Sequence, residues 1–166
     1  MTRPILLALL VAAADQASKW WTVGNLPLFE PRAVVPGWID LVHVRNPGVA
    51  FSLLSGLDPR WVQPLLILAT LAAVGALVAY LYFLSGNGTA RLGLGLVLGG
   101  ALGNLIDRAR LGYVVDFIDL HWRNLHWPTF NVADIGITVG AALLVADMIF
   151  GNRENDAPRP AADRKH

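Results

Sequence analysis

Long apolar runs alternate with short polar segments along most of the chain, and four of these runs are long enough to cross a membrane. A transmembrane helix needs about 20 mostly apolar residues at a rise of about 1.5 Å each. The four predicted spans cover residues 5–24, 61–84, 92–112 and 128–150. The pattern therefore predicts an α-helical integral membrane protein with four transmembrane helices, built as a single membrane-embedded domain over residues 1–152.

The first run has an alternative interpretation as a cleavable signal peptide. Arg3 precedes an apolar stretch that ends in small residues, as in such peptides. However, Asp15 and Lys19 interrupt the run, and three further spans follow it. Both observations favour a transmembrane helix that is retained.

The polar segments between the runs differ in length and character. Residues 25–60 form the longest loop, in which "GWIDLVHV" has the β-branched, partly alternating pattern of a strand and "RNPG" marks a turn. This loop is predicted to hold a small β-structure. The tail at residues 153–166 is polar and contains proline, which predicts disorder.

Composition supports a membrane protein and excludes several other classes. The chain is 55% hydrophobic and 15% charged, whereas soluble domains carry about 25% charged residues. It has no cysteine, which excludes disulfides and thiolate chemistry. The net charge of +1 gives no argument for nucleic-acid binding, and the four histidines lack metal-binding spacing. We expect neither a metal nor a cofactor.

The orientation in the membrane follows only weakly from charge. Four spans place both termini on one side, and the distribution of Lys and Arg slightly favours the cytoplasm for that side. Tryptophan is more informative, because all six fall on the opposite side and indole rings anchor at membrane interfaces. They are Trp20, Trp21, Trp38, Trp61, Trp122 and Trp127.

Polar residues inside the spans are predicted to share one layer in the outer half of the membrane. Counted along ideal helices, Asp15, Lys19, Asn104 and Asp107 lie roughly 15–22 Å from the side of the termini. Asp134 lies roughly 9 Å below the opposite surface, at a similar level. Ionisable groups at such depth are costly and are usually functional. The layer therefore indicates a site.

Each pair of polar residues also has a structural interpretation. Asn131 and Asp134 can cap the last helix, and an acid in a first turn suits the helix dipole. Asp15 with Lys19, and Asp107 with Arg108, can form ion pairs. The glycines of the third span, at positions 95, 99 and 103, follow a small-xxx-small pattern that permits close helix packing.

Five motifs together resemble the lipoprotein signal peptidase family, also called signal peptidase II. They are "DQASK" (15–19), "RNPGVAFS" (45–52), "GGALGNLIDR" (99–108), "VVDF" (114–117) and "FNVAD" (130–134). The resemblance covers the chain from the first span to the last, and each motif is weak alone. It implies four transmembrane helices with a small extracytoplasmic β-cradle and a short extracytoplasmic helix.

The resemblance also implies an activity and its setting. Members of the family are aspartic endopeptidases of the bacterial inner membrane. They remove signal peptides from diacylglyceryl-modified prolipoproteins, cutting just before the lipidated cysteine. By this resemblance we expect inhibition by globomycin, a monomer in contact with membrane lipid, cytoplasmic termini and an active site near the periplasmic face.

The motifs assign the expected site residues. The catalytic dyad maps to Asp116 and Asp134, with Asp119 as a rival of Asp116. Supporting or substrate-binding roles map to Asp15, Lys19, Asn46, Gly48, Asn104, Asp107, Arg108 and Asn131. Two carboxyls held close cannot both be ionised, so one keeps a proton while the other activates water.

Two other classes of function remain open from the residues alone. A small membrane transporter or proton channel also uses intramembrane acids, but its polar groups should extend through the whole membrane. A structural membrane subunit would not need acids in three of four spans.

Overall fold

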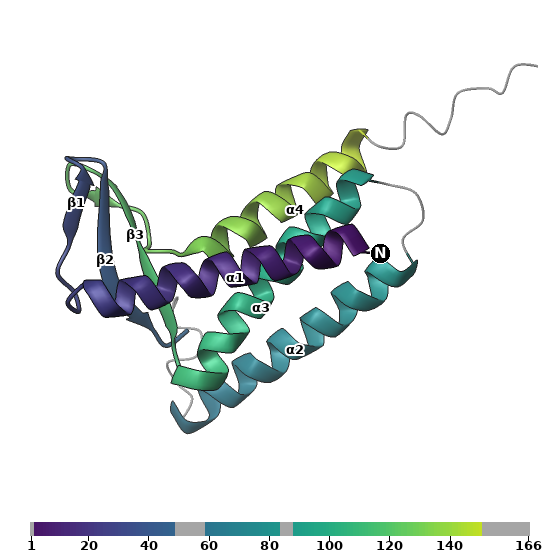
Figure 1. Cartoon of the computed structure of the whole chain (residues 1–166), viewed down its shortest axis with the longest axis horizontal. Coiled ribbons are helices and arrows are strands. Elements are labelled where there is room, and N and C mark those ends of the chain that lie inside the picture. The colour runs from purple at the N-terminus through teal and green to yellow at the C-terminus, as the bar shows by residue number, and fades with distance from the viewer. Residues whose placement is uncertain (1, 49–58, 84–87, 151–166) are drawn as a thin grey trace, which may run out of the picture.

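The computed structural model describes residues 2–48, 59–83 and 88–150, as a helix bundle with a sheet at one end (Figure 1). The helices are α1 (Thr2–Asn25), α2 (Pro59–Phe83), α3 (Gly88–Leu111) and α4 (Val132–Phe150). The strands are β1 (Arg32–Val35), β2 (Ile39–Asn46), β3 (Val114–Trp122) and β4 (Leu125–His126). The expected disordered tail, residues 153–166, lies outside the described residues.

Three helices are long and apolar enough to cross a membrane by length and composition. They are the segments Arg60–Phe83, Gly88–Leu111 and Val132–Phe150. Helix α1 has a similar length of 24 residues, but Asp15 and Lys19 interrupt its apolar sequence. The four predicted runs therefore correspond to helices, and three of these helices have the length and composition of a membrane span.

Helix α4 begins at Val132, four residues later than the predicted start at Pro128. The preceding segment is extended, because Phe130 pairs with Ile118 of β3. The Ile118 amide donates to the Phe130 carbonyl at 2.9 Å, and the Phe130 amide donates to the Ile118 carbonyl at 3.1 Å. Pairing to the sheet therefore replaces the first turn that the apolar pattern suggested.

Helix α3 lies at the centre of the bundle and packs against α1, α2 and α4. Its glycines allow this close approach, as the small-xxx-small pattern predicted. A Cβ atom at Gly99 would lie 2.6 Å from the Ala8 carbonyl oxygen of α1, and one at Gly93 would lie 2.8 Å from the Gly140 carbonyl oxygen of α4. Backbone therefore meets backbone on two sides of α3.

The sheet is antiparallel in the order β1-β2-β3-β4. The strand predicted from "GWIDLVHV" is confirmed as β2, although it runs on to Asn46. Strand β3 was not predicted, because its first four residues, Val114–Phe117, are all buried and show no alternation. Residues 26–48 hold no short helix, and the rest of the predicted loop, residues 49–58, lies outside the described residues.

All six tryptophans lie at the end of the bundle that carries the sheet. Trp20 and Trp21 are in the last turns of α1 and Trp61 is in the first turn of α2. The other three belong to the sheet and its connections, where the Trp38 and Trp122 rings stack at 6.3 Å. Five of the six are more than half exposed, and Trp21 is 43% exposed. This exposure suits a membrane interface.

Replacing Gly99 by alanine tests the close packing of α1 on α3. We expect Gly99→Ala to lower the free energy of unfolding in detergent by about 1–3 kcal/mol, the usual cost of overpacking. Gly75→Ala is the matched control, because a Cβ atom at Gly75 in α2 meets nothing within 4 Å. Alanine there should leave stability unchanged or raise it slightly. Equal melting curves for both variants would contradict the packing argument.

Candidate active site

The polar residues of the spans converge where α1, α3 and α4 meet strand β3. Six of the ten predicted site residues are almost fully buried there. Their side chains are 0–7% exposed, and they are Asp15, Lys19, Asn104, Asp107, Asp116 and Asn131. The predicted polar layer is thus a single connected cluster beneath the sheet.

The Lys19 ammonium group is the hub of this cluster. It lies 2.8 Å from a carboxylate oxygen of Asp15 and 2.9 Å from one of Asp107. It also donates a hydrogen bond of 2.9 Å to the side-chain oxygen of Asn104. The predicted Asp15–Lys19 ion pair is confirmed. Asp107, which had Arg108 as a possible partner, pairs with Lys19 of the neighbouring helix.

The two carboxylates around Lys19 also bind backbone amides of other elements. Asp15 accepts a hydrogen bond of 2.9 Å from the Ala133 amide in the first turn of α4. Asp107 accepts one of 3.0 Å from the Val115 amide in β3. Because all three ionic groups are hydrogen-bonded, the cost of burying them is largely offset. The cluster fixes α4 and β3 relative to α1 and α3.

Gln16 belongs to the cluster, although the sequence did not predict a role for it. Its amide nitrogen donates to an Asp107 carboxylate oxygen at 2.8 Å and to the Gly103 carbonyl at 3.1 Å. The available signal was a glutamine beside Asp15 inside an apolar run. A buried amide indicates a site less strongly than a buried ion does, because it costs less to bury. It still needs hydrogen-bond partners at that depth.

Asn131 and Asp134 form a helix cap and also belong to the cluster. The Asp134 amide donates to the Asn131 side-chain oxygen at 3.0 Å, and the Asn131 amide donates back to Asp134 at 3.2 Å. This reciprocal pattern is a capping box. The Asn131 side-chain nitrogen is then free to donate to Asp116 at 2.6 Å. One asparagine therefore contacts both predicted catalytic carboxyls.

Asp116 projects from β3 into this network. Asn46 of β2 donates a hydrogen bond of 2.9 Å to its second carboxylate oxygen, and the Gly48 amide fixes the Asn46 side chain at 2.8 Å. Burial raises the pKa of Asp116 to about 6, and the nearby Asp134 carboxylate adds to the rise. The hydrogen bonds from Asn46 and Asn131 act in the opposite direction.

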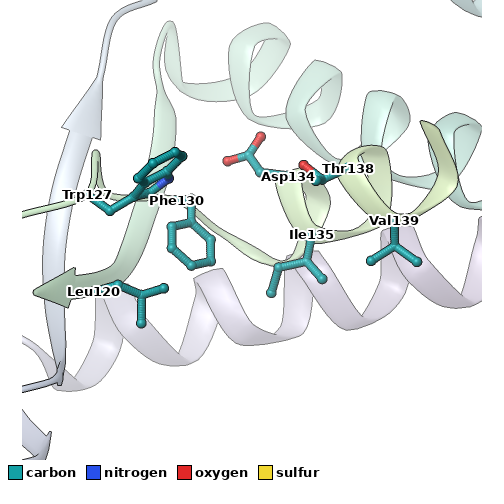
Figure 2. Close-up of a pocket in the computed structure, with 7 residues that line it drawn as sticks. All are labelled: Leu120, Trp127, Phe130, Asp134, Ile135, Thr138 and Val139. Carbon is teal, nitrogen blue, oxygen red and sulfur yellow. The ribbon is translucent and has the colours of Figure 1, made fainter. Parts of the chain in front are cut away.

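Asp134 lies at the rim of an open pocket. Its other oxygen accepts a hydrogen bond of 2.9 Å from Asn104, whose carbonyl lies 3.5 Å from the Arg108 guanidinium. The pocket has a volume of about 320 Å³ and is otherwise almost wholly apolar. Figure 2 shows the Asp134 carboxyl turned away from Leu120 and Ile135, two of the apolar side chains that line the pocket.

Asp119, the rival of Asp116, lies in a different environment. It is an odd number of residues away on the same strand, so its side chain leaves the opposite face. It pairs with His126 of β4 at 3.0 Å, and His126 stacks on His121. Among the described residues, no hydrogen bond joins Asp119 to the Lys19 cluster. In those same ranges, no group of His, Asp and Glu has metal-binding geometry.

Buried carboxyls where apolar helices meet a small sheet are typical of a functional site in a membrane protein. Residues 7–150 match the family described as signal peptidase (SPase) II. Lipoprotein signal peptidases of Oleidesulfovibrio alaskensis and Syntrophotalea carbinolica are 46% and 47% identical to the chain. These matches cover 82% and 85% of the chain, and 87% of each relative.

Two solved structures show the same fold. Both are described as bacterial membrane enzymes determined by the in meso method, and they align with TM-scores of 0.80 and 0.78 at 28% and 30% identity. The alignments cover 98% and 90% of this chain, and 96% and 94% of those chains. The chain belongs to the signal peptidase II family, and it is therefore a membrane peptidase.

Replacing Lys19 tests whether the buried ionic cluster holds the bundle together. We expect Lys19→Met to destabilise the fold by about 3–5 kcal/mol, because Asp15 and Asp107 would remain buried without their cation. Arg3→Met is the matched control, since Arg3 is an exposed cation on the same helix. Chemical denaturation in detergent micelles measures both variants. A Lys19→Met protein as stable as Arg3→Met would show that the cluster adds no stability.

Proposed function

We propose that this chain is an aspartic endopeptidase that removes signal peptides from diacylglyceryl-modified bacterial prolipoproteins. The cut falls just before the lipidated cysteine, and Asp116 and Asp134 form the catalytic pair. The observation that carries the proposal is the position of Asn131, which hydrogen-bonds to both carboxyls. The relatives named as lipoprotein signal peptidases supply the substrate class.

The two carboxyls divide the work of general acid and general base. Asp116 carries the shared proton, because its pKa of about 6 is higher than that of an ordinary carboxyl. Ionised Asp134 takes a proton from water as the water oxygen attacks the peptide carbonyl, and Asp116 donates its proton to that carbonyl oxygen. When the C–N bond breaks, the cysteine nitrogen accepts a proton from Asp134, and a hydroxyl of the tetrahedral intermediate returns a proton to Asp116. The signal peptide leaves, and both carboxyls are back in their starting states.

The remaining site residues position these two groups. Asn46, oriented by the Gly48 amide, holds Asp116 from the side of the sheet. Asn104 holds Asp134 from α3, and Arg108 lies close enough to add positive charge to that side of the site. Asp15, Lys19 and Asp107 form the platform beneath. Fixed dipoles of this kind need little rearrangement during the reaction.

The membrane placement completes the proposal. We place α1 across the membrane with the other three helices, because it packs along α3 and also contacts α4. The N-terminus then lies at the end of the bundle away from the sheet, as does the end of α4 (Figure 1). We assign that end to the cytoplasm and the sheet to the periplasmic face of the inner membrane. Residues 1–152 act as one domain and as a monomer.

A transporter or proton channel receives less support than a peptidase. The described polar cluster lies near the sheet, and the segment Arg60–Phe83 beside it is almost wholly apolar. Membership in a peptidase family points in the same direction. We accordingly expect the cyclic peptide globomycin to inhibit the chain.

Conservative replacement of either carboxyl tests the catalytic pair. We expect Asp116→Asn and Asp134→Asn each to lower the rate of prolipoprotein cleavage by at least about 10²–10⁴-fold, the usual contribution of a positioned acid or base. Purified protein and a lipidated precursor, resolved on a gel, give the measurement. Asp119→Asn is the matched control, because Asp119 is buried on the same strand but pairs with His126. The pairing of Asp116 with Asp134 is wrong if Asp119→Asn alone abolishes cleavage.

The pH dependence tests which carboxyl carries the proton. Since the pKa of Asp116 is raised to about 6, its acid form persists below that pH and is lost above it. We therefore expect kcat/KM to fall as the pH rises through about 6, and to fall in the same way for Asp119→Asn. Rates measured in one detergent over a range of buffers provide the profile. A kcat/KM that stays level up to pH 8 would place the required proton elsewhere.

A further inference from the structure

We propose that a groove between α1 and α3, on the flank of the site, binds the phosphate of an anionic glycerophospholipid. The groove, called here the α1–α3 groove, has a volume of about 120 Å³. Gln16, Lys19 and Asp107 line it together with Trp20, Arg110 and Leu111. It is distinct from the apolar pocket beside Asp134, with which it shares no lining residue. The inference does not depend on the proposed peptidase chemistry.

Among the described residues, one cation that lines the groove has no partner. Arg110 is exposed in the last turn of α3, and no hydrogen bond or ion pair is found for it in the described ranges. Lys19 lies between Asp15 and Asp107, and all three are already bonded within the cluster. The Arg110 guanidinium is therefore the cation of the groove that remains available to an anion. Its planar set of N–H donors matches two phosphate oxygens.

The surroundings of Arg110 favour a lipid over a free anion. Trp20 is 82% exposed, Val23 is 50% exposed and Leu111 is 43% exposed, so the rim of the groove is apolar and open. Trp20 and its neighbour Trp21 lie near the end of α1 that faces the sheet, at the expected level of lipid headgroups. An indole ring there can contact glycerol and the first part of an acyl chain.

The size of the groove sets what it can enclose. Pockets that bury a whole drug-sized ligand measure about 300–1,000 Å³, well above the volume of the α1–α3 groove. A phosphodiester with part of its glycerol fits such a space, while the acyl chains remain outside along the helices. We therefore assign the phosphodiester to Arg110 and leave the chains in the bilayer.

The assignment is tested with full-length protein in bilayer nanodiscs containing phosphatidylcholine and phosphatidylglycerol. After transfer to mild detergent, native mass spectrometry counts the lipids that remain bound. We expect retention of phosphatidylglycerol over phosphatidylcholine, and about tenfold weaker retention in Arg110→Gln through loss of a charge-assisted hydrogen bond. Arg32→Gln is the matched control, because Arg32 is an exposed cation of β1 at the same end of the molecule.

The outcomes separate the possible ligands. Equal retention of phosphatidylglycerol by Arg110→Gln and Arg32→Gln would overturn the site. So would equal retention of the two lipids by the unaltered protein. In a parallel sample, inorganic phosphate competes for the groove. Displacement of the lipid by phosphate at a comparable concentration would show that the groove recognises a free anion, and would overturn the lipid assignment. Failure to displace it supports a lipid.

Discussion

The placement of one buried ammonium group, that of Lys19, determines the rest of the structure. It lies between Asp15 and Asp107. The other carboxylate oxygen of Asp15 accepts a hydrogen bond from a backbone amide of α4, and the Asp107 oxygen that contacts Lys19 also accepts one from a backbone amide of β3. Each ion would be costly alone in a membrane, so each requires the others. Helix α4 and strand β3, which carries Asp116, are thus fixed to the same charged core.

This core can form only because the helices approach very closely. A Cβ atom at Gly103 of α3 would occupy the space of the Asp15 carboxylate, and Gly99 one turn earlier meets the backbone of α1. Membrane helices gain little from hydrophobic burial against one another, so contact depends on shape and on polar bonds. The glycines supply the shape and the Lys19 cluster supplies the bonds.

The sequence predicted the depth of the polar residues in the membrane, but it predicted few of the contacts between distant elements. Apolar length alone predicted the four helices, and counting along them placed Asp15, Lys19 and Asp107 in one layer, because helical rise is constant. Strand β3 escaped prediction, since Val114–Phe117 is buried on both sides and has no alternating pattern. Gln16 escaped it as well, because its role depends on Asp107 of another helix, 91 positions away.

Asn131 serves two roles at once: it caps helix α4, and it belongs to the candidate active site. A capping box fixes the backbone of Asn131 and the side chain of Asp134 by local bonds alone. Because these local bonds fix the conformation of the cap, the Asn131 side-chain nitrogen points in one direction, toward Asp116 on another element. A flexible asparagine would lose entropy each time it bridged two carboxyls. The cap therefore orients the Asn131 side chain, and it makes the site rigid before any substrate arrives.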